Sequence, residues 1–168
     1  MSKAAEKLKE EVLALLPPTI FFFVALHVVA LVRSLMTQGT GLSPSSSAQI
    51  AVGALIIGKA VLLADLWPPI NRFPERPLIY NIVWKTFVYF VVATVIHYLE
   101  RLYEFAKAAG GLAAGNAKLL SEIVWPHFWA IQIVLIVLIF NYCMLRELGR
   151  AIGEERTLRL FFSARRAA

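Results

Sequence analysis

The chain is poor in the residues that build common catalytic and metal sites. Its 168 residues include one cysteine, Cys143, which excludes an internal disulfide and disfavours a cysteine-ligated zinc or iron–sulfur site. The sequence contains no P-loop, GxGxxG turn, HExxH motif or Ser-His-Asp pattern. It also lacks a basic helix or an RNA-binding motif, so we expect no nucleic-acid partner. These absences favour a non-enzymatic protein and leave an enzyme as the alternative.

Long apolar runs dominate what is present. Apolar residues make up 59% of the chain, above the roughly 45–50% that is typical of soluble domains. Four runs are each long enough to cross a bilayer, which takes about 20 residues, and they cover 17–36, 49–67, 78–105 and 123–145. A soluble protein would have almost no polar surface left to cover them. The sequence therefore predicts an all-α integral membrane protein with a four-helix transmembrane bundle over residues 17–145.

Two segments flank the predicted bundle. Residues 1–16 place apolar side chains at helical spacing opposite lysines and glutamates, which predicts an amphipathic helix lying in the membrane interface. Pro17 and Pro18 predict a turn or kink after it. Residues 146–168 form a basic tail that we expect to lie amphipathically on anionic lipids. The tail residues expected to contact lipid are Arg156, Arg159, Phe161, Phe162, Arg165 and Arg166.

The positive charges are distributed unevenly between the two ends of the predicted spans. Most lysines and arginines lie in the N-terminal segment, the second connection and the tail, whereas the first connection, TQGTGLSPSSSA, has no charge. By the positive-inside rule, both termini are predicted to be cytoplasmic. The compact chain and its arginine bias favour a bacterial inner membrane.

Ionisable side chains inside the predicted spans form the first candidate site. These residues are His27, Lys59, Asp65 and Lys85. A charge at membrane depth costs at least a few kcal/mol unless it is paired, hydrated or neutralised. Depth along the helices predicts that Asp65 meets Lys85, with Lys59 facing water or reaching toward His27. The group is either a structural ion pair or the lining of a path for an ion or proton.

A second cluster of polar residues is expected at the opposite, outer end of the bundle. Its members are His97, Glu100, Glu104, Glu122, His127, Arg33 and Arg101. Histidines and carboxylates could bind a divalent metal, and the arginines could instead make a salt-bridge network. Paired histidines, His97 with His127 or with His27, could ligate a haem. The residues leave these three readings open.

Two connections have distinctive compositions. The segment PPINRFPERP predicts a rigid, non-helical turn, which is either a stiff connector or a docking surface that uses Arg72, Glu75 and Arg76. The segment GGLAAGNA predicts a turn with glycines as helix stops.

Three hypotheses for function follow. The first is a self-associating bundle whose polar cluster passes or senses an ion or small solute. The second is an accessory or assembly subunit of a larger membrane complex. The third is a membrane redox protein that binds a metal or haem. The expected partners are the lipid bilayer, anionic lipids, and a second copy or another membrane subunit.

Overall fold

The described part of the chain is helical. The computed structural model describes residues 3–36, 44–72, 75–153 and 156, which contain no strand. The helices are α1 (Lys3–Met36), α2 (Pro44–Asp65), the 3₁₀ helix η1 (Pro68–Asn71), α3 (Leu78–Ala109), α4 (Leu112–Ser121) and α5 (Trp125–Ile152). Four of them, α1, α2, α3 and α5, are long and apolar enough to cross a membrane. The predicted all-α fold with four such helices is confirmed.

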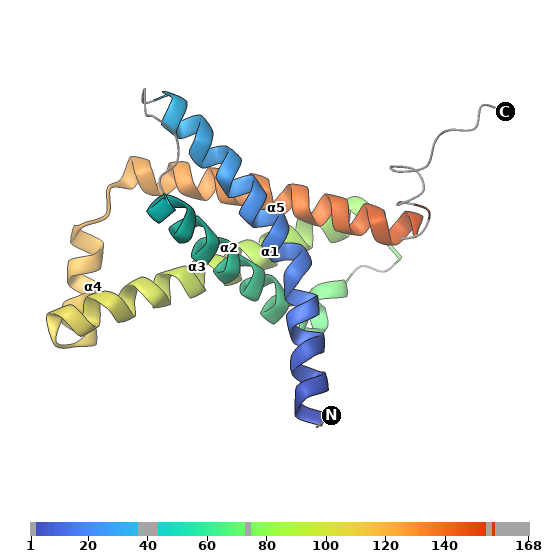
Figure 1. The fold of residues 1–168 in the computed structure, drawn as a ribbon, viewed down its shortest axis with the longest axis horizontal. Coiled ribbons are helices and arrows are strands. Elements are labelled where there is room, and N and C mark those ends of the chain that lie inside the picture. The colour runs from blue at the N-terminus through green and yellow to red at the C-terminus, as the bar shows by residue number, and fades with distance from the viewer. Residues whose placement is uncertain (1–2, 37–43, 73–74, 154–155, 157–168) are drawn as a thin grey trace.

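The long helices pack in sequence around a small core. Helix α1 packs along α2, α2 contacts α3, and α3 packs against α5, while α1 also crosses α5 (Figure 1). The core holds Phe22, Tyr89, Ile139 and Cys143, each with its side chain almost fully buried. The rings of Phe22 and Tyr142 lie 5.4 Å apart, which joins α1 to α5.

The outward faces of the long helices are apolar. Large exposed apolar side chains occur on all four, and they include Ile20, Val24, Val52, Phe87, Ile133 and Val137. Contiguous apolar surface on this scale marks contact with lipid or with another protein. The exposed faces therefore agree with a bilayer around the bundle.

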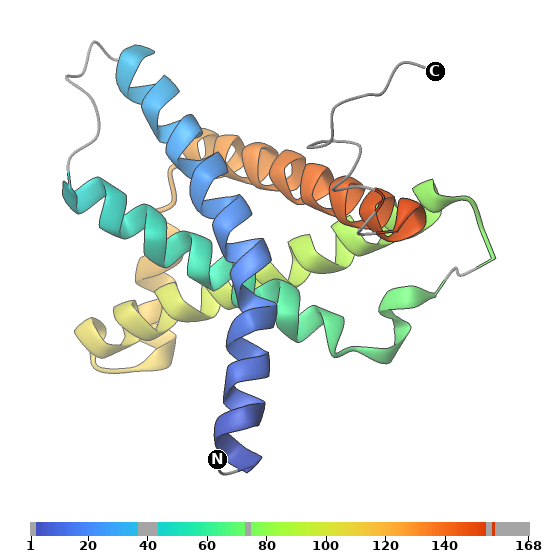
Figure 2. The ribbon, with the colours of Figure 1, turned by 45° about the vertical axis from the view of Figure 1, so that its right-hand side comes forward.

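Helix α1 continues through the two prolines. Pro17 and Pro18 lie inside it, where they cannot donate to the carbonyl groups one turn earlier. Figures 1 and 2 show α1 changing direction part-way along its length, as a proline-containing helix does. Residues 3–16 are thus the first part of α1, and their place in the membrane interface stays a prediction.

The connection after α3 differs from the predicted turn. Gly110 ends α3 with a left-handed φ of 75°, as expected of a glycine cap. The chain then forms α4, which packs against the end of α3 (Figure 2). Gly115 lies buried inside α4, where an added Cβ would stand 2.5 Å from the Ala106 backbone. The prediction of a continuous turn over GGLAAGNA was wrong because Gly115 serves close helix packing and does not stop a helix.

Helix α2 begins at Pro44, before the predicted start at 49, and α3 ends at Ala109, after the predicted end at 105. Two further differences bear on the candidate sites. The proline-rich connection contains the 3₁₀ helix η1, so it is not wholly non-helical. Helix α5 runs to Ile152, seven residues beyond the predicted end of the fourth span at 145. The first part of the predicted tail therefore continues the helix, and this extension carries Arg146, Glu147 and Arg150, of which Glu147 is buried.

Gly115→Ala should destabilise the protein because its new methyl group would meet the Ala106 backbone. We expect the free energy of unfolding in mixed micelles to fall by about 1–3 kcal/mol, as for other overpacked sites. Gly149→Ala on α5 is the matched control, since an added Cβ there meets no atom within 4 Å. Equal unfolding free energies for the two variants would contradict the packing of α4 on α3.

Candidate functional site

One end of the bundle contains a buried ion pair between α3 and α5. Lys85 Nζ donates to Glu147 Oε1 over 2.6 Å, and the two side chains are 3% and 9% exposed. Arg150, one turn further along α5, also donates to Glu147 Oε1 over 3.3 Å. Because both oppositely charged partners are removed from solvent, each compensates the desolvation of the other.

A second ion pair joins α2 to α5 beside the first. Arg146 Nη1 donates to Asp65 Oδ2 over 2.5 Å and to the Tyr89 hydroxyl over 3.1 Å. The Tyr89 hydroxyl in turn donates to Asp65 Oδ1. We call these six residues the ion-pair cluster: Asp65, Lys85, Tyr89, Arg146, Glu147 and Arg150. The cluster ties α2, α3 and α5 together through charged hydrogen bonds, which are stronger than neutral ones.

The ion pairs differ from those predicted. Asp65 and Lys85 were expected to pair with each other, but each pairs with a residue of α5. The missed partners are Arg146, Glu147 and Arg150, which were assigned to the tail. Helical spacing could have identified them, because they continue one face of α5 at intervals of three or four residues. That face comprises Ile139, Tyr142, Cys143, Arg146, Glu147 and Arg150. A span that ends at residue 145 excludes the last three of these residues.

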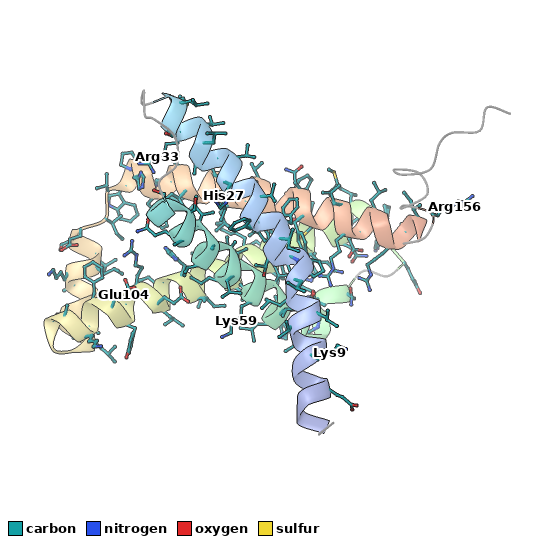
Figure 3. The ribbon with its side chains drawn as sticks, viewed as in Figure 1. Lys9, His27, Arg33, Lys59, Glu104 and Arg156 are labelled. Atoms are coloured by element: carbon teal, nitrogen blue, oxygen red, sulfur yellow. The ribbon has the colours of Figure 1, made fainter. Side chains whose placement is uncertain are left out.

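His27 and Lys59 do not join the ion-pair cluster. His27 is half-buried, and its Nδ1 lies 2.9 Å from the carbonyl oxygen of Phe23, one turn earlier on α1. Lys59 lies exposed on α2 and makes no hydrogen bond or ion pair with another described residue (Figure 3). The described residues therefore do not bring the four predicted intramembrane groups into one polar path.

The opposite end of the bundle contains an open cavity of about 960 Å³, which we call the His97 cavity. It lies among α1, α2, α3 and α5, and Figure 3 labels two of its lining residues, Arg33 and Glu104. Six of the seven residues of the predicted outer cluster line it: Arg33, His97, Glu100, Arg101, Glu104 and His127. The seventh, Glu122, is exposed beyond α4 and lies 4.0 Å from Lys118. Six residues of the predicted cluster therefore share one cavity wall, while their function stays a prediction.

Most of the remaining cavity wall is apolar. Its aliphatic residues come from all four long helices and include Leu26, Val29, Val52, Ile56, Ile131 and Leu135. Gly53 also lines the cavity, and an added Cβ there would meet no atom within 4 Å. A cavity with aliphatic walls and a few polar groups is the usual form of a small-molecule site.

The His97 cavity also contains a polar pair that the sequence analysis missed. Thr94 Oγ1 donates to Gln132 Oε1 over 3.4 Å, joining α3 to α5. Gln132 is only 8% exposed. Neither residue is ionisable, so a search for charged groups in the spans passes over both.

The predicted metal and salt-bridge arrangements find limited support at the cavity. Within the described residues, no three His, Cys, Asp or Glu side chains are grouped closely enough to hold a metal ion. Arg101 pairs with Glu104 over 3.4 Å, in an exposed contact between neighbouring turns of α3. Such a surface pair contributes little stability. His97 and His127 face one cavity, whereas His27 does not line it.

The predicted docking and lipid-contacting residues lie outside these two sites. Arg72 Cζ lies 5.8 Å from the centroid of the Trp84 ring, a cation–π contact, and Trp84 Nε1 donates to the Pro69 carbonyl over 3.0 Å. Glu75 and Arg76 are exposed, as is Arg156 (Figure 3). Arg159, Phe161, Phe162, Arg165 and Arg166 lie outside the described residues. A docking role for the loop and a lipid-binding role for the tail stay predictions.

The protein is a helical bundle in which four helices are long and apolar enough to cross a membrane. One end of the bundle contains the ion-pair cluster, and the other end contains the His97 cavity. No protein-family model, curated protein or solved structure matches the chain. A function must therefore be argued from the sites themselves.

Lys85→Met should destabilise the protein because it leaves Glu147 buried beside Arg150 alone. Breaking a buried ion pair costs about 3–5 kcal/mol, and the remaining arginine places the expected loss near the lower bound. The double variant Lys85→Met/Glu147→Leu should recover much of that loss. Unfolding in mixed micelles measures the coupling as a double-mutant cycle. Additive losses would show that the two side chains do not interact.

Proposed function

We propose that the protein binds and senses a small amphiphilic solute in the His97 cavity. The observation that carries the proposal is the cavity itself, whose size falls within the roughly 300–1,000 Å³ of ordinary ligand sites. Its aliphatic walls suit an apolar body, and its histidines, arginines and glutamates suit a polar group. The same combination describes molecules that partition into a membrane with one end at its surface.

The arrangement of the two sites supports binding and sensing over passage. None of the ion-pair cluster residues lines the His97 cavity. At the cluster the charged groups are paired with one another and joined by short hydrogen bonds. A permeating ion would have to separate these pairs, which is costly away from water. In this proposal the cavity is a binding site, and the ion-pair cluster is the contact that holds α2, α3 and α5 together at the other end of the bundle.

The charge distribution supports a defined orientation for this proposal. In it, the protein lies in a bacterial inner membrane with both termini in the cytoplasm, as the lysine and arginine pattern predicts. The ion-pair cluster then lies toward the cytoplasm, and the His97 cavity opens toward the outer face. The solute would enter from that face or from the outer leaflet.

A second role, assembly with another subunit, is favoured by one observation. Lys59 is exposed on α2, six residues before the helix ends at Asp65, and has no ion-pair partner among the described residues. An ammonium group on the lipid-facing side of a span is costly and commonly pairs within a bundle. We propose that Lys59 contacts an acidic group of a second copy or of another membrane subunit.

Filling the cavity should abolish solute binding. In Gly53→Leu the added side chain would enter open space in the cavity, while in Gly149→Leu it would enter open space on α5 away from it. Native mass spectrometry of wild type, purified from membranes in mild detergent, should show a co-purifying small molecule. Gly53→Leu should lose it, and Gly149→Leu should retain it.

Two outcomes of that measurement count against a solute site. One is the absence of any non-protein mass from the wild-type protein. The other is equal recovery of the same mass from both glycine variants, which would place the molecule outside the cavity.

Removing the Lys59 charge should weaken assembly. Lys59→Met is expected to shift the detergent-corrected particle mass toward that of a single chain, because the intersubunit ion pair is lost. Lys107→Met, at the end of α3, is the control for loss of an exposed lysine. An unchanged assembly mass in Lys59→Met would rule out this contact, and light scattering provides the measurement.

A further inference from the structure

The buried side-chain amide of Gln132 lines the His97 cavity. Its oxygen accepts a hydrogen bond within the protein, and its nitrogen donates none to a described residue. Gln132 is 8% exposed, and its Oε1 accepts the Thr94 hydroxyl over 3.4 Å. Its Nε2 has no acceptor among the described residues, and it is not enclosed by protein. An amide nitrogen carries two N–H donors, so this group requires an acceptor from outside the bundle.

The position of Gln132 makes that requirement strong. It lies seven residues after the start of α5 at Trp125, which is about 10 Å along the helix at 1.5 Å per residue. In a bilayer this depth lies within the hydrocarbon region, where an unsatisfied N–H is costly because water is scarce. Ala93, Ile57 and Leu135 also line the cavity, and their side chains cannot accept a hydrogen bond.

The chemistry of the donor restricts what can satisfy it. A neutral amide N–H suits a neutral oxygen acceptor, since a charged acceptor would itself need compensation in an apolar cavity. Two histidines that line the cavity lie closest to this depth: His97 is three residues, about 4.5 Å, beyond Thr94 on α3, and His127 is five residues, about 7.5 Å, before Gln132 on α5. The ligand therefore needs an oxygen at the depth of Gln132 and can carry a polar or charged group nearer the cavity mouth.

We propose that the solute bound in the His97 cavity is an apolar molecule with a carbonyl oxygen that accepts a hydrogen bond from Gln132 Nε2. This inference rests on the proposed solute-binding function and specifies the ligand's class. Two kinds of membrane molecule offer this chemistry: the acyl ester of a phospholipid and the ring carbonyl of a lipid-soluble quinone. Thr94 positions the amide by holding its oxygen, which directs the nitrogen toward the ligand.

Matched probes with and without the carbonyl test the inference. The first pair is a phosphatidylglycerol with ester-linked chains and its ether-linked counterpart of equal chain length. The second pair is an alkyl naphthoquinone and the corresponding alkyl naphthalene. Each is added to the delipidated full-length protein, and the bound fraction is measured by native mass spectrometry. We expect the carbonyl-bearing member of one pair to bind about fivefold more tightly, the ratio for one net hydrogen bond.

Two variants connect that preference to the amide. Gln132→Met keeps the length of the side chain without its N–H groups, and it should reduce the preference to about equal binding. Asn141→Leu is the control, because Asn141 lies on the same helix outside the cavity and donates to its own helix at Val137 O. It should retain the full preference, and the pair that shows the preference identifies the ester or the quinone as the source.

The possible failures are distinguishable. If the wild type binds both members of each pair equally and Gly53→Leu loses them all, the cavity is a ligand site and the carbonyl inference is overturned. The same result is expected if water satisfies Gln132. A preference that persists in Gln132→Met also overturns the inference, as does failure of all four probes to bind. The proposed function itself stands or falls on the co-purification experiment, which uses no chosen probe.

Discussion

The scarcity of water inside a bilayer is the constraint on which this structure depends. In hydrocarbon every polar group must find its partner within the protein or in a bound molecule. The ion-pair cluster meets this requirement with two acids, three bases and a tyrosine from three helices. Because no cluster member comes from α1 or α4, the cluster fixes α2, α3 and α5 as a unit against which α1 and α4 pack.

The same constraint gives the two ends of the bundle different chemical roles. At the cluster, oppositely charged side chains are in direct contact with one another. At the His97 cavity the polar groups are spread around a volume of about 960 Å³, and the Gln132 amide retains donors without protein acceptors. A satisfied network rigidifies a protein, whereas unsatisfied groups around a cavity favour a ligand. Helices α2, α3 and α5 each contribute side chains to both sites.

Much of the architecture could be predicted from hydropathy because span length is set by bilayer thickness. Four helices long and apolar enough to cross a membrane, and the cap at Gly110, followed from local sequence. Six residues of the predicted outer cluster line one cavity, although the sequence did not predict the cavity itself. Helix α4 could not be predicted from composition, because Gly115 looks like a helix stop and is instead the contact that brings α4 against Ala106. The end of α5 was misplaced because arginines and a glutamate resemble an interfacial tail when their partners are unknown.

Sequence alone determined that the chain forms four apolar helices with ionisable groups within them, since period, length and hydropathy are local properties. Only the tertiary structure decided which charges meet. Lys85 pairs with Glu147, 62 residues away in the sequence, and Asp65 pairs with Arg146, 81 residues away. Depth along the helices does not predict these partners, because the rotation and crossing of the helices determine which side chains meet. The tertiary structure also turned Lys59 outward and placed Gln132 at a cavity. These outcomes depend on how side chains from several helices fill a shared volume, which no single segment of the sequence encodes.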